Sequence, residues 1–227
     1  MHIEPGIVEG PKIILSYATA GAAGAYALTL GYRHFRERGP ISLLGGTAAT
    51  TALVFTFFQI LPHYPVGISE VHLILGSTLF LLFGAAPAAF GLALGLLLQG
   101  LFFAPADLPQ YGMNVTTLLV PLFALQFVAR KVIAPDTPYV QLKYRQALAL
   151  STTYQAGIVT WVAFWALYGE GFAGQTVADI ATFGLSYLVV IAIEPLTDLA
   201  VLAGAKTLHQ LKDSSLLERR LYNPSPA

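Results

Sequence analysis

Long apolar stretches recur along the chain from Ile13 onward, and short segments rich in proline, glycine and charge separate them. An α-helix needs roughly 20 apolar residues to cross the hydrocarbon of a bilayer. The pattern therefore predicts an all-α membrane protein, a bundle of about seven transmembrane helices. The predicted spans are Ile13–Tyr32, Ser42–Leu61, Val71–Gly84, Ala85–Ala104, Met113–Val128, Ala147–Tyr168 and Val177–Leu208. The third is so short that a tilted or re-entrant course is also open.

The composition agrees with a membrane protein. Of the 227 residues, 56% are hydrophobic and 11% are charged, whereas a soluble domain carries about 25% charged residues. The chain has no cysteine, which excludes disulfide bonds and thiolate metal sites. The first eleven residues include two glutamates and two prolines and no basic region. We therefore expect no cleavable signal peptide and an N-terminus that is kept in the mature protein.

Basic residues fall on one side of the predicted helices. Eleven of the twelve Lys and Arg residues follow the first span, the fifth span or the seventh. They are Arg33, Arg36, Arg38, Arg130, Lys131, Lys143, Arg145, Lys206, Lys212, Arg219 and Arg220, of which Lys206 lies at the end of the seventh span. Because cytoplasmic loops are rich in Lys and Arg, we predict a multi-pass protein of the inner (plasma) membrane, with the N-terminus outside and the C-terminus cytoplasmic. Residues 1–212 are expected to form one polytopic domain and residues 213–227 a cytoplasmic tail.

The first two residues can chelate a metal ion. The amine of Met1, the deprotonated amide nitrogen of His2 and the His2 imidazole can close two fused rings around one cation. A planar set of nitrogen donors suits Ni²⁺ or Cu²⁺ and can accommodate Co²⁺. The N-terminus is therefore a candidate metal-binding segment that lacks a fourth donor.

Histidines elsewhere in the chain can supply that donor. The topology places His63 and His72 on the same outer face as His2, and it places His34 and His209 on the cytoplasmic side. A tetradentate site can be assembled from Met1, His2 and the imidazole of His72. A hydrogen-bonded residue at a helix end is the open alternative for His72. Because the donors must be deprotonated, binding should weaken as the pH falls through about 6.5.

Several blocks of sequence resemble one family of transport proteins. The blocks are Met1-His2-Ile3 with Pro5-Gly6, the stretch Gln59–Leu73, Gln99-Gly100-Leu101-Phe102-Phe103, and Tyr111-Gly112-Met113-Asn114-Val115. Their order and spacing over residues 1–125 are similar to those of the CbiM/NikM family. These are the membrane substrate-binding (S) components of cobalt and nickel energy-coupling-factor (ECF) ABC transporters.

The resemblance implies a function and partners. In the family the metal is held by the amino group of Met1, by the amide and imidazole of His2, and by a loop histidine, at whose position His72 stands. The chain would bind and translocate Co²⁺ or Ni²⁺ in an ATP-driven importer, together with a transmembrane coupling subunit and ATPase subunits. The first span is rich in Ala and Gly, which favours either docking onto that coupling subunit or packing within the chain.

The chain departs from the family near the loop histidine. Glu70-Val71 precede His72, where members typically have glycine, and His63 replaces an apolar residue. A carboxylate beside the site can accept a hydrogen bond from a ligand imidazole or change which cation fits. We therefore add His63, Glu70 and Asn114 as candidates for the surroundings of the metal ligands.

Other polar residues lie within the predicted spans. Asn114 is expected either to hold the metal site or to bond between helices, whereas Gln99 favours a bond between helices. Glu194 and Asp198 lie one turn apart in the last span, where a carboxylate indicates function. We expect them to face partner subunits or Thr and Tyr groups of the bundle. Their depth is expected to be cytoplasmic, away from the metal site.

The chain is not expected to be an enzyme. Gly204-Ala205-Lys206-Thr207 lacks the phosphate-loop pattern, so ATP hydrolysis would fall to partner subunits. We expect no cofactor besides the transported ion, contacts with membrane lipid, and no nucleic acid. Two alternatives stay open: a haem anchor that uses His34 and His209, and a non-transporting subunit of a larger membrane complex.

Overall fold

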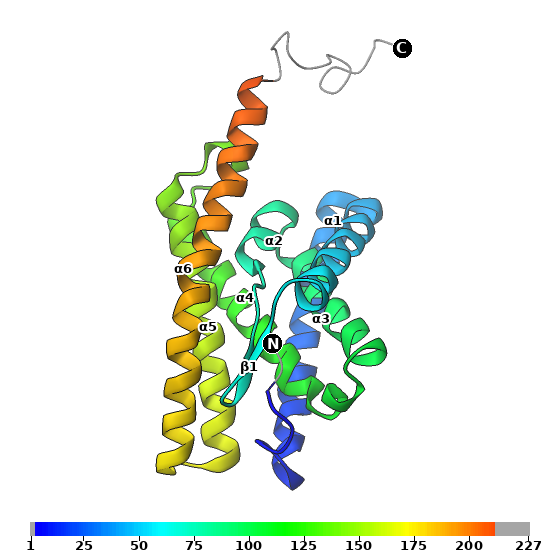
Figure 1. The fold of residues 1–227 in the computed structure, drawn as a ribbon. Helices are drawn as coiled ribbons and strands as arrows, with labels where there is room; N and C mark the ends of the chain where they lie inside the picture. Colours follow the sequence, from blue (N-terminus) through cyan, green and yellow to red (C-terminus); the bar gives the residue numbers. More distant parts are fainter. Residues whose placement is uncertain (1–2, 212–227) are drawn as a thin grey trace.

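The structure is a computed structural model that describes residues 3–211, apart from the side chains of Ile191 and Leu211. Met1, His2 and the predicted tail over residues 213–227 lie outside the described residues. The described chain is mainly helical and includes one small hairpin (Figure 1). In chain order the helices and strands are α1 (Ile13–Gln59), β1 (Tyr64–Val66), β2 (Ser69–Val71), α2 (Gly76–Phe83), α3 (Ala85–Phe102), α4 (Tyr111–Val132), α5 (Tyr144–Glu170) and α6 (Gly174–Leu211). Short 3₁₀ turns cover Gly10–Lys12, Pro105–Gln110 and Tyr139–Gln141.

Helix α1 contains the first two predicted spans. Its backbone leaves helical geometry at Gly39, where φ is 81° and ψ is 169°. The ring of Pro40 disfavours helical geometry in the residue before it, and a positive φ favours glycine. The Gly39-Pro40 pair thus divides α1 into two helical parts, directly after the arginines that close the first predicted span.

Four helical stretches of the described chain are long and apolar enough to cross a membrane: Gly10–Gln59, Ala85–Phe102, Pro105–Val132 and Gly174–Gln210. Together with the helical content, they confirm the prediction of an all-α, multi-pass membrane protein. The number of seven spans and the orientation of the termini stay predictions.

The third predicted span differs from the observed structure. Only Gly76–Phe83 is helical, and these eight residues are too few for the roughly 20 needed to cross hydrocarbon. Val71 ends the hairpin of β1 and β2, which pair in antiparallel register around a two-residue turn, Gly67-Ile68. Gly67 has a φ of 60°, as a short hairpin turn requires of its first residue. A Cβ on Gly67 would also lie 2.9 Å from the backbone oxygen of Asp179 on α6.

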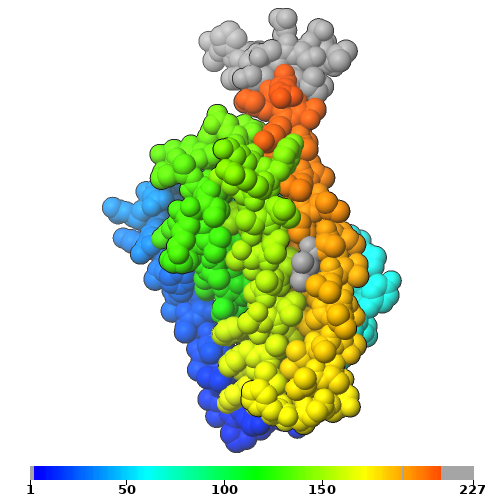
Figure 2. Space-filling model, turned by 90° about the vertical axis from the view of Figure 1, so that its left-hand side faces the viewer, coloured from blue at the N-terminus to red at the C-terminus, as the bar shows by residue number. Residues whose placement is uncertain are grey.

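The helices pack in two flanks around α4. Helices α5 and α6 run side by side on one flank, and α1 and α3 lie on the other (Figure 1). Figure 2 shows α5 and α6 covering one face along most of its height. Leu118, Leu122 and Leu125 of α4 are fully buried between the flanks. Helix α4 is therefore the central helix of the bundle.

The two ends of the bundle carry different groups. The first turn of α1 and the last turn of α6 lie at opposite ends (Figure 1). The N-terminal segment, the turn at Pro105–Gln110 and the α5–α6 connection lie at one end, and the 133–143 loop lies at the other. The hairpin contacts α6 and lies beside the N-terminal segment.

Candidate metal site

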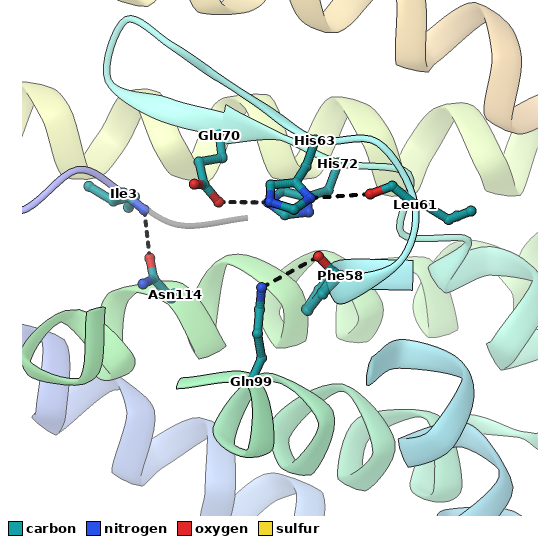
Figure 3. A network of polar contacts seen from close by, with 8 residues as sticks. All are labelled: Ile3, Phe58, Leu61, His63, Glu70, His72, Gln99 and Asn114. Carbon is teal, nitrogen blue, oxygen red and sulfur yellow. Dashed lines mark hydrogen bonds and ion pairs between the residues drawn. The ribbon is translucent and has the colours of Figure 1, made fainter. Parts of the chain in front are cut away.

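The N-terminal segment is attached to both the hairpin and α4. Ile3 forms an antiparallel bridge with Ser69, and the amide of Glu4 donates a hydrogen bond of 3.1 Å to the carbonyl of Ile68. The amide of Ile3 donates to Oδ1 of Asn114 over 2.8 Å (Figure 3). Residues more than a hundred positions apart are thereby joined at the first residue that the structure describes.

Apolar burial reinforces this attachment. The side chains of Ile3 and Val8 are each 1% exposed and pack with Met113 of α4 and Trp165 of α5. Burying an aliphatic side chain stabilises a fold by about 1.5–3 kcal/mol in water-exposed proteins. At the end of the segment, Nζ of Lys12 donates to the carbonyl of Gly169 over 2.7 Å. The segment is therefore an integral part of the fold from its third residue onward.

His72 lies directly after β2, in a buried polar setting. Its side chain is buried, and its Nε2 lies 2.8 Å from Oε2 of Glu70. The ring of His63 stacks on it, with centroids 4.9 Å apart and planes at 5°. Phe58 meets it edge-on at 5.2 Å. Figure 3 shows the two imidazoles overlapping, with the Glu70 carboxylate at their edge and Asn114 facing Ile3 across the site.

This geometry has chemical consequences for His72. In a neutral imidazole one nitrogen donates and the other carries a lone pair. A carboxylate at Nε2 favours the proton there, which puts the lone pair on Nδ1. A carboxylate that accepts the N–H of an imidazole fixes the ring and raises its basicity as a metal ligand. The arrangement of Glu70 and His72 is thus suited to presenting a neutral imidazole to a cation.

The candidate residues come together to different degrees. His72 contacts both His63 and Glu70, and Asn114 holds the adjoining N-terminal segment. Met1 and His2 lie outside the described residues. Within residues 3–211, no group of three or more His, Cys, Asp or Glu side chains is placed to hold a metal ion. The predicted ligand set of Met1, His2 and His72 stays a prediction.

The polar residues of the spans have definite partners. Nε2 of Gln99 donates to the carbonyl of Phe58 over 3.4 Å, which is the bond between helices that the sequence favours. Asp198 accepts hydrogen bonds from the hydroxyls of Ser77 and Thr78. For Asp198, the bond to Thr78 agrees with one of the two expectations, that the carboxylates face Thr and Tyr groups of the bundle and not partner subunits.

Glu194 corrects one prediction. Its carboxylate accepts hydrogen bonds from the amides of Ile74 and Leu75, only two and three residues after His72. The structure therefore places Glu194 beside the segment that follows His72, and not away from it as expected, whereas its depth in the membrane stays a prediction. The difference has a physical cause: the prediction made residues 71–84 one helix, whereas residues 72–75 are not helical and their amides are open to an acceptor from α6.

A separate cavity of about 580 Å³ has a different character. Arg33 and Arg38 of α1 and Arg130 of α4 line it, with Glu37 and Asp136 beside them. None of its lining residues belongs to the hairpin or to the N-terminal segment. Three guanidinium groups repel a divalent cation, so this cavity does not suit the predicted metal.

Comparisons with known proteins agree with this fold and place the chain in a family. Two crystal structures of transition metal transporters share the fold. A truncated one covers 88% of this chain and 96% of its own, with a TM-score of 0.65 and 20% identity. The other covers both chains fully, with a TM-score of 0.61 and 19% identity.

A sequence relative and a family model go further. A protein of Haemophilus influenzae, whose name proposes a role in metal transport, is 33% identical over 139 residues. The match covers 60% of this chain and spans 61% of that relative's length. Residues 2–209 match the model of a family described as the cobalt uptake substrate-specific transmembrane region. The resemblance seen in the sequence is thereby confirmed, and the chain belongs to the CbiM family.

Proposed function

We propose that the chain captures a divalent transition-metal ion, Co²⁺ or Ni²⁺, as the substrate-specific membrane component of an ATP-driven ECF importer. The proposed donors are the amine of Met1, the amide nitrogen and imidazole of His2, and the imidazole of His72. The ion is the transported substrate, and the chain needs no other cofactor. Glu70 orients His72, His63 covers its ring, and Asn114 anchors the segment that carries the first donors.

The attachment of Ile3 carries the proposal. Two residues span at most about 7 Å of extended chain. The donors of Met1 and His2 are therefore within covalent reach of Ile3, which is fixed to Asn114 and to the strand that leads to His72. Anchoring before metal arrives lowers the entropy lost when the four donors close around the ion.

The coupling to ATP rests on partners. Ala23 and Ala27 of α1 are buried in the bundle, whereas Ala18, Gly21, Ala22 and Ala25 are exposed. Small residues let a second helix approach closely in a membrane. We propose this exposed face as the place where a transmembrane coupling subunit docks, while ATPase subunits hydrolyse ATP. Ala22→Leu should then block uptake in cells that carry the whole importer and leave metal binding by the isolated chain intact.

Elemental analysis of the purified chain with its native N-terminus tests the function. Wild type, incubated with Co²⁺ or Ni²⁺ and desalted, should keep close to one metal ion per chain. His2→Ala should lose it, because the substitution removes the imidazole donor and the chelate ring that this imidazole closes with the amide nitrogen. His34→Ala is the matched control: this histidine contacts Ser42 at the opposite end, and its removal should leave the metal content unchanged.

Two outcomes would favour the alternatives. A metal-free wild type under these conditions would favour a non-transporting subunit. A Soret absorption band in the purified protein would favour a haem anchor.

A further inference from the structure

Two fully or nearly fully buried carboxylates stand in helix α6. Glu194 is 0% exposed and Asp198 is 2% exposed. Ionisable groups inside a membrane protein are costly and are retained for a purpose. Both side chains point to one short stretch of chain, the segment from His72 to Thr78, which joins the hairpin to α2.

Glu194 binds the backbone of this segment. One of its oxygens accepts the amides of Ile74 and Leu75, the latter over 3.1 Å. Its other oxygen accepts Nε2–H of Gln155 on α5, and Oε1 of Gln155 in turn accepts the hydroxyl of Tyr187 over 3.1 Å. The two amides precede the first turn of α2, where backbone donors lack partners within the helix. A carboxylate is the strongest acceptor available for them.

Asp198 binds the first turn of α2 through side chains. It accepts the hydroxyls of Ser77 and Thr78, one turn further along α6 than Glu194. The segment is also pressed against α5, since a Cβ on Gly76 would lie 2.2 Å from Cζ of Tyr154. Leu75 adopts a left-handed φ of 54°, a conformation that persists in a bulky residue only when its surroundings impose it. Contacts from α6 at Ile74 and Leu75 and from α5 at Gly76 therefore fix the chain two to four residues after His72.

We infer that Glu194 and Asp198 are positioning residues that clamp the segment Ile74–Thr78 to α6, so that they hold His72 at the metal site and link metal binding to the packing of α6. The link to metal rests on the proposed function, whereas the clamp is a property of the metal-free chain. Coupling of this kind is reciprocal: if the clamp strengthens metal binding, bound metal strengthens the clamp.

Hydrogen exchange of the metal-free, full-length protein tests the clamp itself. In Glu194→Ala, peptides that cover Ile74–Thr78 should exchange about tenfold faster than in wild type, because two buried amides lose their acceptor. Glu194→Gln should stay close to wild type, since its amide oxygen still accepts the two backbone amides and its NH₂ group can donate to Oε1 of Gln155 once that side-chain amide flips. Thr50→Val is the control, because it removes an equally buried hydroxyl bond, between α1 and α3, and no bond to this segment. Exchange in Glu194→Ala that equals wild type would overturn the clamp.

Titration with NiCl₂ tests the link. Glu194→Ala should bind Ni²⁺ about 10- to 100-fold more weakly, as is usual when support for a metal ligand is lost, and the absorption spectrum of bound Ni²⁺ should change. Glu194→Gln should restore both, and Thr50→Val should change neither even if it lowers the melting temperature. In wild type, Ni²⁺ should slow exchange in peptides that cover Glu194–Asp198.

The outcomes separate the two levels of the proposal. Wild-type affinity in Glu194→Ala, with faster exchange at Ile74–Thr78, would overturn the link. If Glu194→Ala fails to fold, the exchange of the wild-type protein tests the link instead. Exchange at Glu194–Asp198 that Ni²⁺ binding leaves unchanged would overturn the link. A wild type that binds neither Ni²⁺ nor, in the same titration with CoCl₂, Co²⁺ would refute the proposed function and the link together, and the exchange experiment would still decide the clamp.

Discussion

The two ends of this bundle treat polar groups in opposite ways. We call the end that carries the N-terminal segment and the metal-site candidates the hairpin end. There, imidazole, carboxylate and amide groups are mostly buried and bonded to one another or to backbone, as in Glu70–His72 and Asn114–Ile3. At the other end, which we call the arginine end, the side chains of Arg33, Arg38 and Arg130 are exposed and line an open cavity of about 580 Å³. Cavity size thus gives no guide to where a metal would bind.

The difference follows from the chemistry of the groups. A transition-metal ion needs several deprotonated donors within bonding distance, held in place before it arrives. Neutral imidazoles and an N-terminal amine meet this requirement when they are fixed by short contacts, and an open space does not help them. Guanidinium groups stay protonated and carry no lone pair. The imidazole groups near the hairpin are therefore of a kind that can bind a transition-metal ion, and the guanidinium groups at the other end are not.

The largest effect is expected from a change at the first residue. A Gly-Ser extension before Met1 converts the amine into an amide, so the amine donor is lost. The amide nitrogen of His2 then lacks the neighbouring donor that closes a ring with it, and it should stop binding as well. At about 3 kcal/mol for each donor, Ni²⁺ affinity should fall about ten-thousandfold. Calorimetric titration before and after proteolytic removal of the extension measures this, and each sample serves as the other's control. Equal affinity in both would exclude the N-terminal amine as a ligand.

The second expected effect separates the two stacked histidines. His72→Ala removes one proposed donor and should weaken Ni²⁺ binding about a hundredfold. His63→Ala removes only the ring that stacks at 4.9 Å, and such contacts are worth about 0.5–1.5 kcal/mol, or about two- to tenfold. Titration of the two variants side by side gives the comparison. If His63→Ala is the more damaging variant, the roles assigned to the two rings are reversed.

The two ends also differ in how far the sequence predicts them. The arginine end follows from the positions of basic residues, because Arg130 lies in the last turn of α4, and Arg33 and Arg38 precede the break of α1 at Gly39. At the hairpin end the sequence indicates the residues His63, Glu70, His72 and Asn114 but not their arrangement. The apolar residues around Val71 fit a buried helix, a strand or a span equally well, and tertiary contacts decide among them.

Two details of the site lie beyond any local pattern. The bridge between Ile3 and Ser69 and the bond between Ile3 and Asn114 join segments 66 and 111 positions apart. Glu194 accepts a hydrogen bond from the amide of Ile74, two residues after His72 and 120 positions before Glu194 in the chain. Short-range periodicity fixes which face a side chain occupies, and it carries no information about which distant backbone amide that side chain will meet.

The third expected effect concerns the anchor of the N-terminal segment. Asn114→Ala leaves the buried amide of Ile3 without its acceptor, which costs about 1–3 kcal/mol. Part of this loss falls on metal binding, so affinity should drop about tenfold, and the melting temperature should fall as well. Asn114→Asp keeps an acceptor oxygen and should recover most of the affinity. A variant Asn114→Ala that is less stable but binds Ni²⁺ as wild type does would show that the anchor serves the fold alone.

The smallest effect on Ni²⁺ affinity is expected from substitutions at the arginine end. They test directly whether the two ends of the bundle act independently. Arg33→Ala combined with Arg130→Ala removes two positive charges from the cavity. Arg130 lies sixteen residues beyond Asn114 on α4, which corresponds to about 24 Å of helix. That separation exceeds the screening length of about 8 Å at physiological salt, and both side chains are exposed. Ni²⁺ affinity should therefore change by less than about twofold, measured at 150 mM salt against wild type. A tenfold change would mean that the two ends act on one another through the helices between them, because direct electrostatics cannot supply it.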